Sequence, residues 1–277
     1  MNELLRIEGL TIAPATHLAR KLVHDVSFVL ETGRTTCIVG ESGSGKSLTA
    51  LAVMGLLPPA LLRQAGRVVF QGRDLASYTQ LQLQDVRGKR IGMIFQEPMT
   101  SLNPVLKVGY QIGEGIAVHL GLRGKALQAR IAALLEQVGI AAERAGSYPD
   151  ELSGGQRQRV MVAMSIACDP VMLIADEPTT ALDVTVQAQI LKLLAELKGR
   201  MNMGMLFITH DFGVVADIAD DVVVMFRGEV VETGPVDRVL GNPQHPYTRA
   251  LLDCVPDAEG RKPLRPIDYA WLKEAAR

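Results

Sequence analysis

The sequence contains few of the residues that mark disulfide-linked, zinc-binding or secreted proteins. It has three cysteines among 277 residues, an odd number, and no two of them have the CxxC spacing. This disfavours a disulfide framework and a cysteine-based zinc site. Cys37 lies in an apolar run, so we expect a core residue in a protein of a reducing compartment. The N-terminal segment MNELLRIEGL has an early acid and no long apolar region, so we expect no secretory signal.

Aromatic residues and long hydrophobic runs are also scarce, and neither sign of charge predominates. Aromatics make up 4% of the residues, so the core is expected to be mainly aliphatic. The net charge is −1 without a basic block, which disfavours a nucleic-acid partner. The longest apolar run, residues 48–62, is interrupted by Pro58 and Pro59 and is too short to span a membrane. We therefore expect a soluble chain that associates with membranes only through a partner.

Short aliphatic runs alternate with stretches of helical periodicity along most of the chain. TTCIVG, VMLIADE and GMLFITH are typical of buried strands, and HDVSFVL alternates as a half-buried strand does. Residues 47–57 are expected to form a helix that Pro58 ends. The period is helical from about residue 102 to 167, as in KALQARIAALLEQVGI. The pattern predicts a parallel sheet covered on both faces, with an inserted helical sub-domain.

The segment GESGSGKS, residues 40–47, matches the phosphate-binding pattern G-x-x-x-x-G-K-[ST]. A strand precedes it and a helix follows it, as that chemistry requires. Lys46 would reach the outer phosphates of a nucleotide, and the hydroxyl of Ser47 would hold Mg²⁺. The alternative is a chance glycine-rich turn, which the flanking strand and helix disfavour.

Polar residues end several of the predicted strands. Asp176 and Glu177 follow a buried strand, where Asp176 fits an acid that organises Mg²⁺ and Glu177 could polarise an attacking water. Gln96 could ligate Mg²⁺ or orient water, and His210 could donate to a γ-phosphate. For each residue alone, a strand-end cap or a satisfied polar role is the alternative. Asp183 could be an ordinary N-cap.

A second glycine turn lies in ELSGGQRQRV, residues 151–160, directly before a predicted helix. Backbone N–H groups at a helix start attract anions, so Ser153, Gly154 and Gly155 form a second candidate phosphate site. The alternative is a plain helix cap built on Ser153, and both roles can hold together.

Taken in order, these motifs resemble the nucleotide-binding subunits of ABC transporters. The phosphate-binding loop, Gln96, LSGGQ, LIADEP, ALD and His210 occur in the family order, and the match covers about residues 4–240. The resemblance implies an α/β fold: a P-loop NTPase, RecA-like core with an N-terminal antiparallel β region and an inserted α-helical sub-domain at about residues 98–168. It implies an ATPase domain over residues 1–245 and a short tail over residues 246–277.

The resemblance also implies a set of site residues. In the family, two subunits bind head to tail, and LSGGQ of one closes over the γ-phosphate bound by the other. Glu177, His210 and Gln96 would be catalytic, and Ser47, Gln96 and Asp176 would hold Mg²⁺. ATP would contact Gly40, Glu41, Ser42, Gly43, Ser44, Gly45, Lys46, Ser47, Leu48, Ser153, Gly154, Gly155, Gln156 and Asp183.

Within the family, the chain is most similar to importers of peptides and nickel. GESGSGKSLTALAVMGLLP, QEPMTSLNP, ADEPTTALDVTVQAQIL and NPQHPYTRALL carry this resemblance, and LVHDVSF is similar to the nickel branch. It implies two transmembrane permease subunits, a second ATPase subunit that is homologous or identical, and an external substrate-binding protein. It implies a peripheral place on the cytoplasmic face of the plasma (inner) membrane, where the helical sub-domain and the Gln96 loop grip the permeases.

The sequence departs from the family pattern at both ends. Around TIAPATHLAR there is no aromatic residue to stack on adenine; Pro14 lies near the expected place, and His17 is the only ring. Cys254 is the only cysteine near the C-terminus, so we expect no iron–sulfur cluster, and the short chain suits the nickel branch. The final segment, DYAWLKEAAR, is either a docking helix or a solvated end.

Two other functions are compatible with parts of the pattern. A soluble ABC ATPase of DNA repair or translation would usually add coiled-coil arms or a tandem ATPase domain, and the sequence has neither. A subunit that holds ATP without hydrolysing it is disfavoured by the intact Lys46, Asp176, Glu177 and His210.

Overall fold

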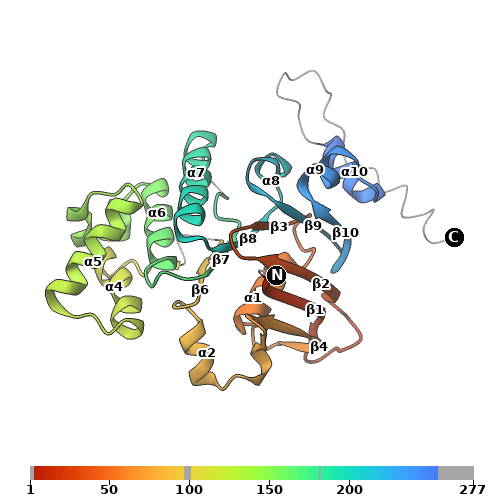
Figure 1. Cartoon of the computed structure of the whole chain (residues 1–277), viewed down its shortest axis with the longest axis horizontal. Helices are drawn as coiled ribbons and strands as arrows, with labels where there is room; N and C mark the ends of the chain where they lie inside the picture. The colour runs from red at the N-terminus through yellow and green to blue at the C-terminus, as the bar shows by residue number, and fades with distance from the viewer. Residues whose placement is uncertain (1–2, 97–100, 181, 255–277) are drawn as a thin grey trace.

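A computed structural model describes residues 3–96, 101–180 and 182–254 of the chain. The described residues form two β-sheets with helices packed around them, as Figure 1 shows. The larger sheet has the strand order β10-β9-β3-β8-β7-β6. Its strands are β3 (Thr35–Val39), β6 (Ile91–Ile94), β7 (Met172–Asp176), β8 (Gly204–Thr209), β9 (Asp221–Phe226) and β10 (Glu229–Pro235).

The larger sheet is parallel except for β10, which pairs antiparallel with β9 at one edge. Every residue of β3, β7 and β8 is buried, because helices or the second sheet cover both faces. This explains why the strands are continuous aliphatic runs in the sequence, and it confirms the predicted parallel sheet.

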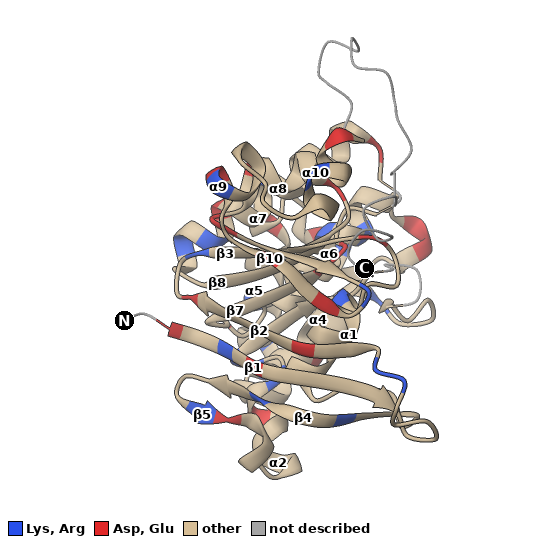
Figure 2. Ribbon diagram, turned by 90° about the vertical axis from the view of Figure 1, so that its right-hand side faces the viewer, with Lys and Arg blue, Asp and Glu red and all other residues tan. Residues whose placement is uncertain are grey.

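The N-terminal part of the chain forms a second, antiparallel sheet with the order β2-β1-β4-β5. Its strands are β1 (Glu3–Pro14), β2 (Val23–Glu31), β4 (Leu61–Phe70) and β5 (Arg73–Asp74). In Figure 2 strands β1, β2 and β4 lie beneath the larger sheet. On β2, Val26, Phe28 and Leu30 alternate inward as predicted, and they share one apolar core with Ile38 of β3 and Leu206 of β8.

Helix α1 (Lys46–Met54) packs into this core between the two sheets, whereas α2 (Gln80–Val86) follows β5 and lies at its rim. The predicted extension of α1 to Leu57 is wrong. The helix ends at Met54 because Gly55 adopts a left-handed conformation with φ of 62° and donates its N–H to the carbonyl of Ala52. A glycine C-cap therefore ends the helix before Pro58 can.

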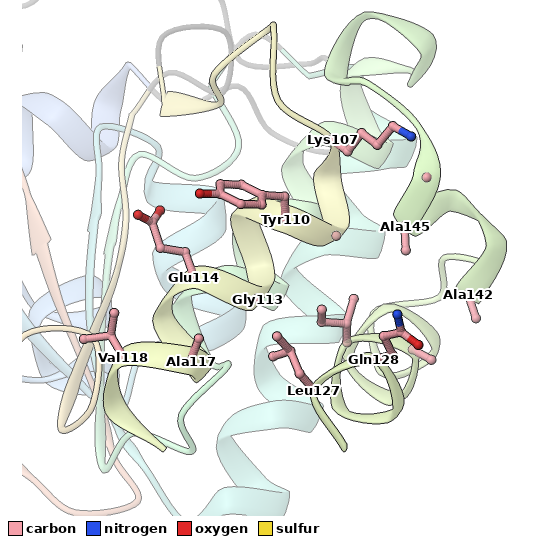
Figure 3. Close-up of a pocket in the computed structure, with 14 residues that line it drawn as sticks. Lys107, Tyr110, Gly113, Glu114, Ala117, Val118, Leu127, Gln128, Ala142 and Ala145 are labelled. Carbon is pink, nitrogen blue, oxygen red and sulfur yellow. The ribbon is translucent and has the colours of Figure 1, made fainter. Parts of the chain in front are cut away.

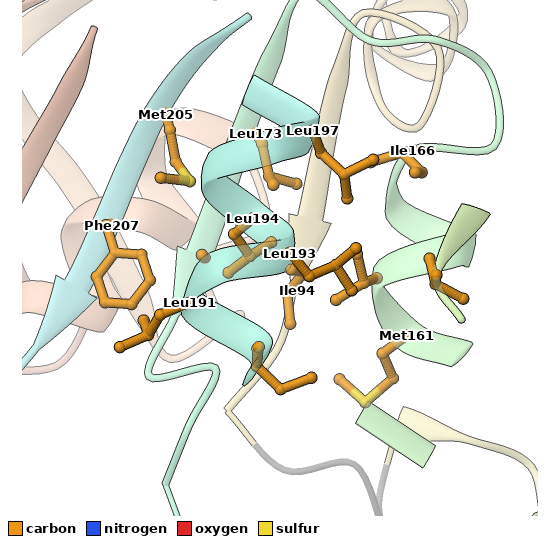
Figure 4. Packing of buried hydrophobic residues seen from close by; sticks show 14 of the residues in the cluster. Ile94, Met161, Ile166, Leu173, Leu191, Leu193, Leu194, Leu197, Met205 and Phe207 are labelled. Carbon is orange, nitrogen blue, oxygen red and sulfur yellow. The ribbon is translucent and has the colours of Figure 1, made fainter. Parts of the chain in front are cut away.

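A second core covers the opposite face of the larger sheet. Helix α7 (Val184–Met201) buries Ile190, Leu193, Leu194 and Leu197, the face that its periodicity predicts. In Figure 4 these leucines lie between strand residues such as Phe207 and side chains of α6 (Gly154–Ser165). Helix α7 thus joins the sheet to the helical part of the molecule.

The helical region predicted from about residue 102 to 167 is confirmed, and in Figure 1 it extends to one side of the sheets. It contains α4 (Val108–His119), α5 (Gly124–Gln137) and α6, joined by 3₁₀ turns at Ala142–Gly146 and Pro149–Glu151; a third lies at Leu75–Ser77. In the described part of the chain no helix is both long and apolar enough to cross a bilayer.

Within the described residues, three further helices follow: α8 (Phe212–Ile218), α9 (Val236–Gly241) and α10 (Pro246–Asp253). Helix α10 is tied to the rest of the fold, because Tyr247 lies in the same core as α7. The division of the chain at residue 245 stays a prediction, and DYAWLKEAAR lies outside the described residues.

The burial of the α7 face predicts a specific loss of stability. Replacing the buried Leu194 by alanine leaves a cavity between the sheet and α6, so we expect the free energy of unfolding to fall by about 2–5 kcal/mol. The matched control Leu81→Ala alters an exposed leucine of α2 and should cost less than about 0.5 kcal/mol. Urea titration without nucleotide measures both, and equal losses would contradict the packing of α7.

Candidate active site

The glycine loop of residues 40–45 joins the end of β3 to the start of α1. Gly40 has φ of 156°, and a Cβ there would lie 2.1 Å from the carbonyl oxygen of Met225, so no larger residue fits without displacing β9. Gly45 is the N-cap of α1, and no side chain caps that helix end. The N–H groups of the first turn therefore remain available to an anion.

Lys46 lies beneath this loop and is only 4% exposed. Its Nζ donates to the carbonyl oxygens of Gly40 at 2.7 Å and Glu41 at 2.9 Å. Burial lowers the pKa of Lys46, and the carboxylates of Glu177, Asp176 and Glu41 oppose that shift. The structure thus holds a desolvated cation at the mouth of the loop, with neutral carbonyl groups as its hydrogen-bond partners.

Asp176 ends β7 and accepts a hydrogen bond from the hydroxyl of Ser47 at 3.0 Å. The side chain lies beside α1 and the residue is 5% exposed. Burial raises the pKa of Asp176 to about 6, against the lowering effect of the Ser47 hydrogen bond; Glu177 raises it further and Lys46 lowers it. The two predicted magnesium ligands Ser47 and Asp176 are therefore already paired.

Glu177 brings together the polar ends of three neighbouring strands. Its Oε2 accepts from Nε2 of Gln96, which follows β6, at 3.1 Å and from the hydroxyl of Thr180 at 2.9 Å. Its Oε1 lies 3.4 Å from Nδ1 of His210, which follows β8. Glu177 itself has φ of 46°, a strained value for a non-glycine residue, and its N–H donates to the carbonyl of Ile208. The three predicted catalytic residues thus meet at one place.

A cavity of about 150 Å³ lies between the glycine loop and this carboxylate. Its lining consists of residues that the sequence already singled out: Ser42, Gly43, Gly45, Lys46, Ser47, Leu48, Gln96 and Glu177. The cavity therefore joins the phosphate-binding side and the hydrolytic side of one site.

The LSGGQ segment does not line this cavity. Ser153 is the N-cap of α6 and accepts from the N–H of Gln156 at 3.3 Å, while Oε1 of Gln156 accepts from the N–H of Ser153 at 3.0 Å. The helix-cap interpretation is therefore correct, and it leaves the phosphate interpretation open. Asp183 likewise caps α7 by accepting from the N–H of Val186 at 2.8 Å, whether or not it contacts a nucleotide.

Two residues at the site lie in segments that carry the family resemblance, but neither of them was given a role there from the sequence. Thr180 holds Glu177, and only its place three residues further along the chain could have suggested a side-chain contact. Tyr247 lies far away in sequence, yet its hydroxyl accepts from the N–H of Glu41 in the glycine loop at 3.1 Å. Near the expected adenine position, Pro14 ends β1 and the following residues, including His17, are exposed.

The parallel sheet, the glycine loop and the strand-end carboxylates define a P-loop nucleoside triphosphatase. Comparison with known families shows to which family of P-loop nucleoside triphosphatases the chain belongs. Residues 23–180 match the family described as ABC transporter, and residues 231–270 match the oligopeptide/dipeptide transporter C-terminal region. The chain therefore belongs to the ABC transporter family, as an ATPase subunit.

Similar proteins support this assignment. The chain is 49% identical over 263 residues to the oligopeptide transport ATP-binding protein OppD of Bacillus subtilis, covering 94% of this chain and 74% of OppD. It is 50% identical over 272 residues to the glutathione import ATP-binding protein GsiA of Escherichia coli, covering 95% of this chain and 44% of GsiA. The structure of CbiO1 from Clostridium perfringens, part of an ABC transporter complex, matches with a TM-score of 0.75 and 27% identity over 87% of this chain and 92% of CbiO1.

The raised pKa of Asp176 predicts a pH dependence of stability in the ligand-free chain. The folded state keeps a proton that the unfolded state releases near pH 3.8, so the contribution of Asp176 to stability falls as the pH rises from about 4 to about 6. Asp176→Asn removes this effect. The variant should exceed the wild type by up to about 3 kcal/mol in free energy of unfolding at neutral pH, and the difference should vanish near pH 4.

Denaturant titrations from acid to neutral pH, in EDTA and without nucleotide, measure this difference. Asp150→Asn, at an exposed carboxyl, is the control and should show no such pH-dependent gain. A gain for Asp176→Asn that stays constant across the pH range would contradict the buried, proton-binding carboxyl.

Proposed function

We propose that the chain is the ATP-hydrolysing subunit of an importer for short peptides, acting with a second ATPase subunit on the cytoplasmic face of the plasma (inner) membrane. The observation that carries the proposal is the convergence of Gln96, Glu177 and His210 beside the loop that contains Lys46. A peptide cargo is favoured over nickel, because OppD and GsiA are named for oligopeptides and glutathione and the C-terminal match is to peptide transporters. Nickel rests on sequence resemblance alone.

The glycine loop and α1 supply the phosphate-binding side of this function. The uncapped N–H groups of α1 would donate to the β- and γ-phosphates, and Lys46 would exchange the carbonyls of Gly40 and Glu41 for phosphate oxygens. The fit is supported by the desolvation of Lys46, because a buried ammonium group gains more from an anionic partner than from neutral carbonyls.

The residues around Ser47 fit a magnesium ion that accompanies ATP. Ser47, Asp176 and Gln96 offer hydroxyl, carboxylate and amide oxygens, the donors that Mg²⁺ prefers. Within the described residues, no cluster of three or more His, Cys, Asp or Glu side chains could hold a metal by itself, so the ion would share its coordination with phosphate oxygens. When bound, it would neutralise charge on the phosphates.

Glu177 is the group best placed to activate water. Its carboxylate borders the cavity, and Gln96 and Thr180 fix its Oε2 by hydrogen bonds. A water between the loop and Glu177 would lose a proton to the carboxylate as its oxygen attacks the γ-phosphorus. The bond from that phosphorus to the bridging oxygen would break, and ADP and phosphate would leave. His210, beside Oε1, would donate to a γ-phosphate oxygen.

The LSGGQ segment would complete the site of a second subunit. Its N–H groups lie at the start of α6, away from the cavity that Lys46 lines, so they are not needed for the nucleotide of their own chain. In a head-to-tail pair, Ser153, Gly154, Gly155 and Gln156, together with Asp183, would approach the γ-phosphate held by the partner. ATP would then stabilise the closed pair, and hydrolysis would release it.

A larger cavity in the helical sub-domain is the proposed contact with the permeases. It has a volume of about 650 Å³ and lies between α4, α5 and residues 142–146 (Figure 3). Tyr110 and Val118 border it from α4, and Val118 is 71% exposed. An apolar hollow with exposed rims suits an inserted segment of a partner subunit. The alternative of a soluble ATPase of DNA repair or translation is not favoured, because the relatives are named for import and transport.

Removing the proposed base should separate ATP binding from hydrolysis. We expect Glu177→Gln to slow ATP turnover by about a hundred-fold or more, because the amide cannot accept the water proton. The variant should still bind ATP and form a longer-lived dimer in gel filtration with ATP. Glu196→Gln, at an exposed position of α7, is the control and should turn over normally. Normal turnover by Glu177→Gln would show that another group is the base.

A charge at the rim of the larger cavity should weaken assembly without affecting the ATPase site. We expect Val118→Asp to lower the recovery of co-expressed permeases by about ten-fold, because the carboxylate would be buried on docking. ATP binding by the isolated chain should not change. The control Leu81→Asp places the same charge on α2, outside the cavity, and should assemble normally. Equal recovery of all three chains would exclude this docking surface.

A further inference from the structure

We propose that Tyr247 of helix α10 is a positioning residue of the nucleotide site, which holds the first peptide group of the glycine loop in its phosphate-binding conformation. The proposal rests on nucleotide binding by the loop, and it adds a functional residue from the C-terminal region. Tyr247 would act through the backbone of the loop and would not touch the nucleotide.

Tyr247 is fully buried, although it lies near the C-terminal end of the described residues. The residue is 0% exposed, and its ring centroid lies 4.2 Å from that of Phe226, which ends β9 next to the loop. A buried tyrosine places its hydroxyl where a polar partner can satisfy it. Here the hydroxyl accepts the N–H of Glu41 at 3.1 Å.

This hydrogen bond acts on a single peptide group that is also held from its other side. The carbonyl of Gly40 and the N–H of Glu41 belong to the same planar unit, and the carbonyl accepts from Lys46 at 2.7 Å. Gly40 also lies against the backbone of Met225. When Lys46 turns to the phosphates, the carbonyl loses its partner. The Tyr247 hydroxyl still accepts the N–H of Glu41 and so continues to hold this peptide group.

The start of α10 is in turn fixed to β10. The carboxylate of Glu232 accepts from the N–H groups of Gln244 at 2.8 Å and His245 at 3.0 Å, and Nδ1 of His245 accepts from the N–H of Tyr247 at 3.1 Å. Hydrogen bonds to an ionised carboxylate are among the stronger ones in proteins. A continuous set of contacts therefore leads from β10 through the helix start to the glycine loop.

The hydroxyl and the ring of Tyr247 make separable contributions. The ring fills the space beside Phe226 and supports folding, whereas the hydroxyl accepts the N–H of Glu41 in the loop backbone. Loss of the hydroxyl would let the nucleotide-free loop adopt other conformations, and the fraction ready for phosphate would fall. The affinity of the loop for a nucleotide should then fall, whereas Gln96, Glu177 and His210 should keep their positions.

The test compares full-length wild-type and Tyr247→Phe chains. In calorimetric titration with ADP, we expect the dissociation constant to rise about five-fold, the effect of one hydrogen bond. The KM for ATP should rise by a similar factor, and kcat should change by less than about two-fold. Tyr78→Phe removes the hydroxyl of a half-buried tyrosine that follows the 3₁₀ turn Leu75–Ser77, away from the glycine loop, and should behave as the wild type.

Two results would overturn the proposal. If Tyr247→Phe bound ADP as tightly as the wild type, even with a lower thermal midpoint, the residue would be structural only. If kcat fell while KM stayed unchanged, Tyr247 would act in the chemical step and not in nucleotide binding. A wild-type chain that failed to bind ADP would overturn the nucleotide site itself, and so is distinguishable from both.

Discussion

The burial of one ammonium group is the constraint on which the site depends. Lys46 can lose its hydration only because the carbonyls of Gly40 and Glu41 turn toward it, and this requires the backbone conformation that glycine permits at position 40. The same turn starts α1 with free N–H groups. The loop therefore places the Lys46 ammonium group and the N–H groups of α1 close together. Neutral carbonyls stabilise this positive charge only in part, and the negative charge of a polyphosphate would stabilise it further.

The order of the sheet explains why the hydrolytic residues meet beside that loop. Strands β6, β7 and β8 are parallel neighbours, so the residues after them, Gln96, Glu177 and His210, lie at one edge. Strand β3 pairs with β8 in the same direction, which brings the glycine loop to this edge too. The second sheet supports the arrangement from below by sharing a core with α1. Residues far apart in the sequence thus become one site through strand order alone.

Sequence patterns predicted the parts of this structure that depend on local rules. Continuous aliphatic runs predicted the buried parallel strands, and the periodicity around Leu194 predicted the inner face of α7. The end of α1 was predicted wrongly, because a positive φ at Gly55 competes with Pro58 and periodicity does not rank the two. The contact of Tyr247 could not be predicted, since it depends on how distant segments pack. The contact of Thr180 with Glu177 is local, but it depends on the turn after β7, whose geometry the sequence pattern does not specify.

Two helix starts, those of α1 and α6, are proposed to bind phosphate, but the carboxylates Asp176 and Glu177 lie beside the first of them. This difference bears on how the subunit would work. The start of α6 does not line the cavity of the glycine loop, so its N–H groups can serve a nucleotide only if another subunit presents one. Helix α6 also packs on α7, which packs on the sheet. A dense apolar core of this kind transmits displacement as a unit. Helix α4 contacts α6 and contributes Val108, Ile112 and Ile116 to the same core, so approach of a second subunit to Ser153 would also move α4, on the proposed permease side of the sub-domain.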